Sequence, residues 1–171
     1  MTTHAQTHPH APTSADHGSS GLGRAFNRIL ATPHDPAATI LRITLAVVMF
    51  PHGAQKALGW FGGYGWSGTM GYFTGQAGLP APVAALVILV EFLGPLLLLA
   101  GLLTRPVALA FVGLMIGAVT VGGHLQHGFF MNWLGNQGGE GVEYHLLVVG
   151  IAVALVLRGA GAWSLDRRLT R

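Results

Sequence analysis

The chain has 171 residues, of which 51% are hydrophobic and only 9% are charged. Soluble domains carry about 25% charged residues, so this composition excludes an ordinary soluble globule and favours a domain in lipid. There is no cysteine, which excludes disulfides, thiolate metal sites, cysteine-ligated iron–sulfur clusters and cysteine nucleophiles. The net charge is +3, and the basic residues are so thinly spread that no nucleic-acid partner is expected.

Residues 1–36 differ in composition from the rest and are predicted to form a disordered, His/Pro-rich cytoplasmic tail. Its first four histidines, His4, His8, His10 and His17, have neither a fixed geometry nor a sulfur partner, so we assign them no metal site. At residues 21–31, apolar side chains recur at helical spacing with Arg24 and Arg28 between them. This pattern fits a short interfacial helix on the membrane surface, and a loose linker is the alternative.

Four apolar segments follow, at about residues 38–58, 82–103, 106–123 and 142–157. A spanning helix needs about 20 residues, a length that the second segment satisfies best. The fourth segment is short unless its helix starts in the loop before it. The first segment is interrupted by polar residues. The predicted fold is all-α: a four-transmembrane-helix bundle over residues 37–160, with a short interfacial helix in the first outer loop. Residues 161–171 form a basic interfacial C-terminal tail.

With four spans, the cations divide unevenly between the two sides of the membrane. Lys56 is alone on one side, and the other side holds the remaining eight of nine: Arg24, Arg28, Arg42, Arg105, Arg158, Arg167, Arg168 and Arg171. By the positive-inside rule both termini are then cytoplasmic. An odd number of spans would remove this asymmetry, so the charge pattern itself favours four.

The first outer loop, Gly59–Ala81, carries six aromatic residues, a composition typical of the membrane interface. Gly63, Gly65 and Gly68 match the GxGxxG pattern of dinucleotide-binding proteins. No strand precedes them, so we exclude a dinucleotide site.

Glu91 is the most informative residue. It follows Pro82 by nine positions, which places it about 13 Å into the membrane. An ionised carboxylate at that depth is costly unless it is paired or protonated. Pro95 cannot donate a hydrogen bond to the carbonyl of Glu91, so the helix is weakened there. One interpretation is an acid that handles protons or binds a ligand. The structural alternative is a neutral Glu hydrogen-bonded to a neighbouring helix.

Polar groups of the other three helices reach a similar depth. His52 and Lys56 share one face of the first helix, and His52 is the expected partner of Glu91. On the third helix, Gly113 and Gly117 predict a close helix contact that aims His124 into the outer mouth of the bundle. On the fourth, a stripe at spacings of 4, 3 and 4 aims Glu143 there too. His145 lies on another face and is interpreted as interfacial.

These groups define a candidate binding site in the outer half of the bundle. Glu91 and His52 are the candidate catalytic residues. The candidate ligand-binding residues are Lys56, Gln55, Trp60, His124, Glu143 and Tyr144. No metal site is expected, and a haem held by His52 and His124 is disfavoured because only their matching depth argues for it.

Several segments are similar to motifs of the DoxX family. They are FPHGAQKALGWFGG at Phe50–Gly63, Gly68-Thr69 with Gly78–Pro80, EFLGPL at Glu91–Leu96, GLLTR at Gly101–Arg105, Glu143-Tyr144 and WSLD at Trp163–Asp166. The resemblance covers about Leu41–Leu169. It implies a four-helix protein of the bacterial inner membrane, associated with quinone-linked oxidoreductase complexes, including thiosulfate:quinone oxidoreduction, and with thiol or oxidative-stress systems.

The leading functional hypothesis is therefore a redox-associated membrane subunit that binds a quinone or similar lipophilic molecule, with no covalently bound cofactor. Its expected partners are the lipid bilayer and other membrane or redox subunits. The alternative is a non-catalytic accessory subunit of a larger complex. A small transporter is disfavoured because no inverted repeat is visible. The lack of cysteine argues against a thiol relay.

Overall fold

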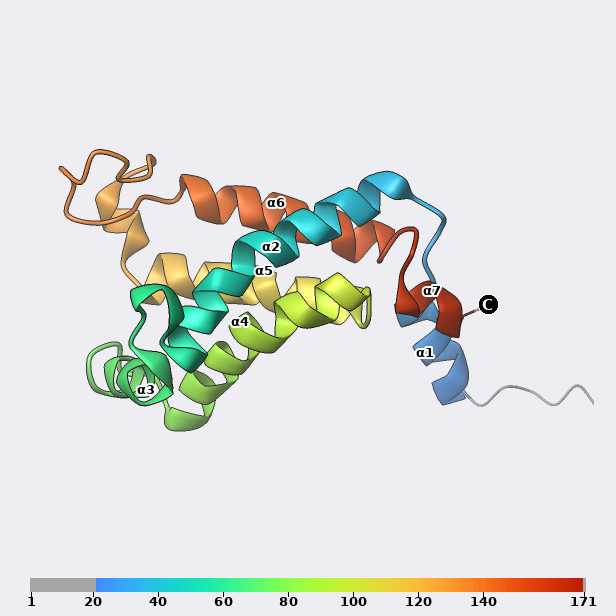
Figure 1. Ribbon diagram of the computed structural model, residues 1–171, viewed down its shortest axis with the longest axis horizontal. Coiled ribbons are helices and arrows are strands. Elements are labelled where there is room, and N and C mark those ends of the chain that lie inside the picture. The colour runs from blue at the N-terminus through green and yellow to red at the C-terminus, as the bar shows by residue number, and fades with distance from the viewer. Residues whose placement is uncertain (1–20, 171) are drawn as a thin grey trace, which may run out of the picture.

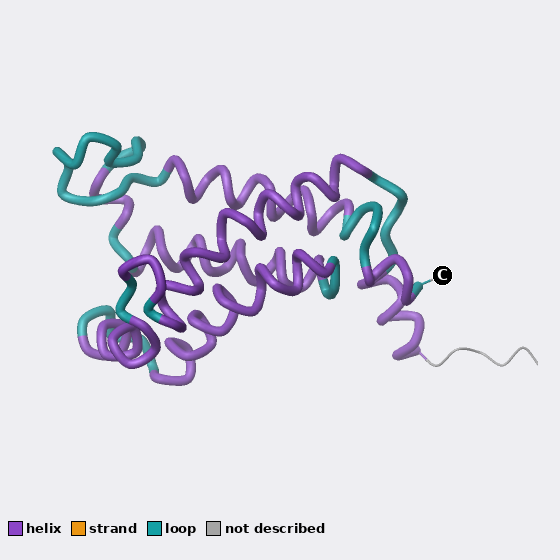
Figure 2. Tube along the Cα trace, in the orientation of Figure 1, coloured by secondary structure: helices purple, strands orange, loops and turns teal. Residues whose placement is uncertain are grey.

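The computed structural model describes residues 21–170, and in that range every regular element is a helix (Figure 1). Four long helices run side by side along the length of the molecule (Figure 2). They are α2 (Pro36–Leu58), α4 (Ala81–Ala100), α5 (Thr104–Val121) and α6 (Glu143–Arg158). The short elements are α1 (Gly21–Leu30), η1 (Trp60–Gly62), α3 (Gly65–Gly75), η2 (His124–His127) and α7 (Leu165–Leu169). Of the tail predicted to be disordered, residues 1–20 lie outside the described range, and residues 21–36 contain α1 and Asp35, the N-cap of α2.

The core of the bundle lies where two helix pairs meet. Helix α2 packs chiefly against α4, and α5 packs chiefly against α6. Leu45, Met49, Leu98, Phe111 and Leu155 are among the fully buried side chains between them. Three helices, α2, α4 and α5, are long and apolar enough to cross a membrane. Helix α6 has 16 residues, fewer than the roughly 20 of a full span.

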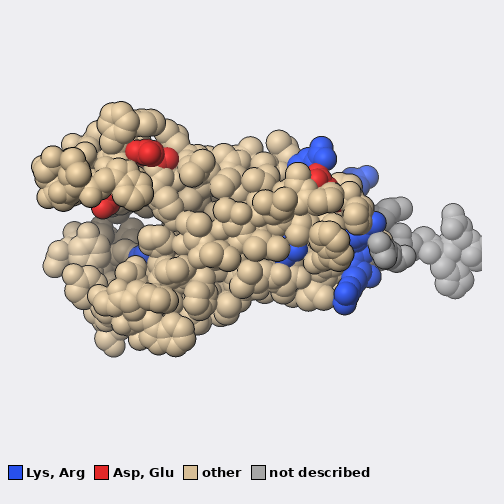
Figure 3. Space-filling model, turned by 45° about the horizontal axis from the view of Figure 1, so that its top comes forward, with Lys and Arg blue, Asp and Glu red and all other residues tan. Residues whose placement is uncertain are grey.

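Most of the cations of the described residues gather at one end of the molecule. Figure 3 shows the largest group of them at the end where α1 and α7 lie, whereas Lys56 lies beside Glu91 towards the opposite end. Helix α1 is held there by Arg105, whose guanidinium donates to the carbonyl oxygens of Arg28, Ile29 and Ala31. The connections from α4 to α5 and from α6 to α7 lie at the same end.

The turn between α4 and α5 begins and ends earlier than the sequence pattern predicts. Helix α4 ends at Ala100 because Gly101 adopts the left-handed conformation, with φ of 66°. Helix α5 begins at Thr104, before Pro106. The carboxylate of Asp166 caps it by accepting from the backbone N–H of Leu103 at 2.8 Å and of Thr104 at 2.9 Å. This cap comes from 62 residues further along the chain, so no local pattern could reveal it.

Arg42 is buried at the end of the bundle where α4 and α6 end, and it bonds these segments together. Its side chain is only 1% exposed. Its guanidinium donates to the carbonyl oxygens of Leu98, Leu99, Ala160 and Trp163. These carbonyls belong to the end of α4 and to the connection after α6, where helix geometry leaves carbonyl groups without partners. Arg42 therefore joins three segments of the chain.

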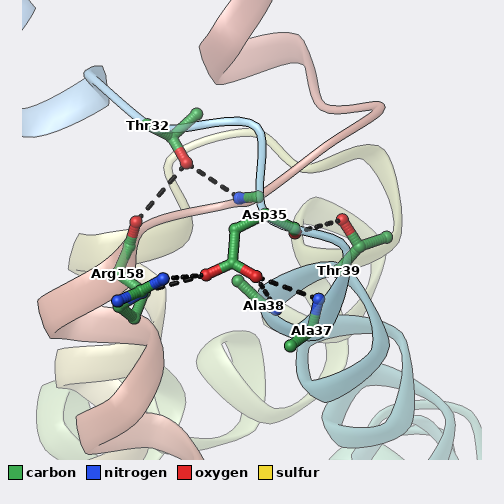
Figure 4. A network of polar contacts seen from close by, with 7 residues as sticks. Thr32, Asp35, Ala37, Ala38, Thr39 and Arg158 are labelled. Carbon is green, nitrogen blue, oxygen red and sulfur yellow. Dashed lines mark hydrogen bonds and ion pairs between the residues drawn. The ribbon is translucent and has the colours of Figure 1, made fainter.

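Asp35 caps the start of α2 and binds α6 (Figure 4). One carboxylate oxygen accepts from the backbone N–H groups of Ala37 and Ala38, at 3.0 and 3.2 Å. The other accepts from Nε and Nη2 of Arg158, at 2.9 and 2.6 Å. The hydrogen bond from Arg158, followed by that from Ala38, lowers the pKa of Asp35 below its ordinary value.

Candidate functional site

A cavity of about 790 Å³ lies between the helices near the end of the molecule that carries α3 and η2. Ligand pockets in proteins span roughly 300–1,000 Å³, so it has room for a small organic molecule. Most of its lining is aliphatic, supplied by α4 and α5. The ionisable or hydrogen-bonding side chains in the wall are His52, Lys56, Tyr72, Glu91, His124, Glu140, Tyr144 and His145.

An ion pair joins two helices at this cavity. Lys56 Nζ of α2 lies 2.6 Å from Oε2 of Glu91 in α4. Glu91 is 5% exposed, whereas the Lys56 side chain is 28% exposed. The expected partner of Glu91 was His52, and the structure assigns that role to Lys56. Side chains of a helix lean toward its N-terminus, so the long Lys56 chain reaches back to the level of Glu91.

The backbone of α4 at Glu91 is packed closely on both sides. Gly53 of α2 lies against it on one side. On the other side, α5 approaches so closely that a Cβ on Gly94 would lie 3.0 Å from the ring of Phe111. Pro95 has no N–H to bond to the Glu91 carbonyl. The carboxylate thus stands at a weakened but tightly enclosed point of α4.

A row of four rings follows one wall of the cavity. His52 packs against Tyr144 with ring centroids 5.6 Å apart, Tyr144 against His145 at 5.7 Å, and His145 against His124 at 4.3 Å. The Tyr144 hydroxyl donates to the sulfur of Met49 at 3.2 Å. Nδ1 of His124 lies 2.8 Å from the carbonyl oxygen of Glu140. The row leads from η2 to the end of α2 that carries Lys56.

The first turn of α6 presents different residues than the stripe pattern predicted. His145 was interpreted as interfacial, but it is 7% exposed and lines the cavity. Glu143 lies outside the lining, and its carboxylate accepts from the N–H of Met131 at 3.1 Å. Leu147, one turn further along that stripe, is 65% exposed. The stripe is therefore the outer face of α6.

Two other predicted ligand-binding residues stabilise the connection between α2 and α3 and do not line the cavity. Gln55 donates through Nε2 to the carbonyl oxygen of Phe61 at 3.3 Å. Trp60 is 53% exposed and packs edge-on against the ring of Phe61. Lys56, Tyr144 and His124 do line the cavity, as expected of ligand-binding residues.

The glycines of α5 have a different role from the one predicted. Gly113 and Gly117 were expected to permit close contact between helices, but a Cβ on either would meet no atom within 4 Å. Both line the cavity. Their missing side chains make space for a ligand and bring no helix closer. Across residues 21–170, no group of three His, Asp or Glu side chains is arranged to hold a metal ion.

These features define an α-helical membrane protein with a polar, ion-paired end to an apolar cavity. The chain belongs to the DoxX family, whose model matches residues 37–124, and the resemblance noted in the sequence is thereby confirmed. It is 28% identical to the Inner membrane protein YphA of Escherichia coli, over 75% of this chain and 87% of that protein. It is 30% identical to the protein named "Putative oxidoreductase CatD" of Bacillus subtilis, over 74% and 82% of the two chains. No solved structure is significantly similar to it.

Proposed function

We propose that this protein is a redox-associated subunit of the inner membrane that binds a quinone or similar lipophilic molecule in the cavity between its helices. The observation that carries the proposal is one buried ion pair, Lys56 with Glu91, at the wall of an apolar cavity of about 790 Å³. Intramembrane charges are costly and commonly mark functional sites. The oxidoreductase name of the Bacillus subtilis relative supports a redox role.

A quinone has an apolar ring system with carbonyl oxygens at two ends, which suits a cavity of this polarity. In the proposed complex, Lys56 donates a hydrogen bond to one carbonyl oxygen, and the aliphatic walls contact the ring and tail. Reduction of a quinone to a quinol takes up two electrons and two protons. Lys56, Glu91 and the neighbouring His52 are the groups that carry protons here, and a redox partner protein would supply the electrons.

The row of rings brings three histidines close together along one wall of the cavity. His52, Tyr144, His145 and His124 are consecutive neighbours from the ion pair's end of α2 to η2. Histidine exchanges protons near neutral pH. We assign His52 and Glu91 to proton exchange with the ligand, and His124 and His145 to exchange with the outer surface.

The proposed topology has α6 as a fourth span, α3 as an interfacial helix and both termini in the cytoplasm. The cations gathered at the end with α1 and α7 support this orientation. Reporter fusions after Arg105 and Arg171 should report the cytoplasm, and one at Gly135 should report the outside. A cytoplasmic signal at Gly135 would exclude this topology.

Ligand binding can be tested by filling the cavity. In Gly117→Leu the new side chain enters the cavity without displacing a helix, since a Cβ there meets no atom within 4 Å. The matched control is Gly150→Leu in α6, which also meets no atom within 4 Å and does not line the cavity. Decylubiquinone should bind saturably to the wild type and to Gly150→Leu in nanodiscs, and roughly tenfold more weakly to Gly117→Leu. Equal binding by both variants would refute the cavity as the quinone site.

The alternative function is an accessory subunit that packs against a larger membrane complex. The loop between η2 and α6 favours this alternative, because its Trp133 is 82% and its Leu134 is 85% exposed. Exposed apolar groups mark interaction sites. This alternative predicts no saturable quinone binding. It also predicts that serine at both positions releases the protein from a larger complex on native gels, while the purified chain remains folded.

A further inference from the structure

A second pocket lies at the end of the molecule with α1 and α7, far from the cavity. Its volume is about 260 Å³. It is lined by His34, which precedes α2, and by Trp163, Ser164, Arg167 and Arg168, which surround the start of α7. The pocket therefore joins two distant segments of the chain.

The two arginines of this pocket have no acidic partner among residues 21–170. The described ion pairs are those of Lys56 with Glu91 and of Arg158 with Asp35. The nearest acid in sequence, Asp166, uses its carboxylate to cap α5. Nε and Nη1 of Arg167 are buried and hydrogen-bond to no atom of the described chain. A buried donor without an acceptor is costly, so an anion at this position would stabilise the end of the bundle.

The remaining wall is suited to the membrane interface. Trp163 is 75% exposed, and its ring lies edge-on to His34 with centroids 6.0 Å apart. Tryptophan is enriched at the level of the lipid headgroups, and basic pockets there bind phosphorylated headgroups. An arginine guanidinium matches two oxygens of a phosphate at once.

We propose that this pocket binds a phosphate group, carried by the headgroup of an anionic phospholipid. Arg167 donates to the phosphate oxygens from inside the pocket, and Arg168 adds charge at its mouth. Trp163 and His34 contact the apolar part of the headgroup region. The site is independent of the quinone cavity, and neither proposal requires the other.

The test compares two single charge losses at the same end. The full-length protein is studied in phosphatidylcholine nanodiscs with increasing phosphatidylglycerol, and bound lipid is measured by native mass spectrometry. Arg167→Gln should weaken phosphatidylglycerol binding roughly tenfold, because charge-assisted hydrogen bonds are lost. Arg28→Gln is the control, since Arg28 is exposed on α1 and does not line the pocket. It should change binding less than about twofold, as expected of a distant charge.

Two further arms complete the test. Arg168→Gln, which alters an exposed side chain, should weaken binding by a smaller factor and covers the case in which Arg167→Gln does not fold. Inorganic phosphate, added to protein in neutral detergent, distinguishes the source of the phosphate group. Saturable binding that depends on Arg167 with phosphatidylglycerol alone identifies a lipid site, and the same binding with phosphate alone identifies a soluble phosphate compound. Equal losses in Arg167→Gln and Arg28→Gln, or no saturable binding of either anion, would overturn the proposal.

Discussion

Gly53 in α2 and Glu91 in α4 are in direct backbone contact, because a Cβ on Gly53 would lie only 2.1 Å from the carbonyl oxygen of Glu91. That carbonyl is the one that Pro95 leaves without a helical donor. The absence of a side chain at position 53 therefore sets how closely the two helices approach, and with it the reach of Lys56 to the Glu91 carboxylate.

Gly53→Ala should separate α2 from α4. Overpacking of this kind costs about 1–3 kcal/mol, and a backbone atom cannot move aside as a flexible side chain can. The free energy of unfolding, measured in mixed micelles of detergent and SDS, should fall by at least that amount. Gly150→Ala is the control, since its Cβ meets no atom within 4 Å. A control as unstable as Gly53→Ala would mean that helix contact is not the cause.

Lys56→Met should destabilise the bundle, because it leaves the buried Glu91 carboxylate without its cation. Removal of one partner of a buried ion pair costs roughly 3 kcal/mol or more. Lys56→Met with Glu91→Leu should recover much of that loss, since no uncompensated charge remains. A double-mutant cycle of unfolding free energies measures the coupling. Strictly additive effects would contradict the pairing.

Arg42→Met removes the guanidinium that donates to the carbonyl oxygens of Leu98, Leu99, Ala160 and Trp163. Of these, the Leu98 carbonyl still accepts from the backbone N–H of Gly101. A buried unpaired polar group costs about 1–3 kcal/mol, so the total loss should exceed about 3 kcal/mol. Arg42→Lys keeps the charge, but a lysine cannot donate to four acceptors at once. Its stability should therefore lie between those of the wild type and Arg42→Met. Thermal melting in detergent ranks the three proteins. A stable Arg42→Met variant would show that these bonds add little.

Asp35 gives the protein a pH-dependent component of stability. Its pKa is lowered from 3.8 in the folded protein, first by the hydrogen bond from Arg158 and next by that from Ala38. A carboxyl with a lowered folded pKa stabilises the protein above its unfolded pKa. That stability is lost as the pH falls below about 4, through the lowered folded value. Asp35→Asn should therefore melt below the wild type at pH 7, and the difference between the two melting temperatures should shrink as the pH falls below about 4. A constant difference across this range would disprove the linkage.

Composition and apolar segment length were sufficient to predict an all-helical membrane protein, and the motifs between Phe50 and Asp166, taken together, were sufficient to predict the family. The orientation of each helix about its axis was harder to predict. In a soluble helix the polar face marks the outside, but lipid and protein interior are both apolar. On α6 the stripe through Glu143 and the stripe through His145 are therefore alike in polarity, and the sequence pattern selected the wrong one.

Contacts between distant segments were also beyond prediction from the sequence. Asp166 caps α5, and Arg42 binds the connection after α6, yet neither has a local motif that marks its partner. Lys56 lines the cavity, but the pairing of Glu91 with Lys56 in place of His52 depends on side-chain reach. The length and flexibility of the Lys56 side chain decide that pairing. The position of a residue along the helix axis does not reveal how far its side chain reaches.

The bonds made by residues 161–170 have a consequence for synthesis. Thr39 donates a hydrogen bond to the carbonyl oxygen of Ala162, and Arg42 donates one to the carbonyl oxygen of Trp163. The carboxylate of Asp166 accepts hydrogen bonds from the backbone N–H groups at the start of α5. A ribosome makes α2, α4 and α5 well before these acceptors exist. The buried guanidinium of Arg42 and the start of α5 thus remain incompletely bonded until residues 162–166 have been made. These bonds form only after α2, α4 and α5 have all been synthesised.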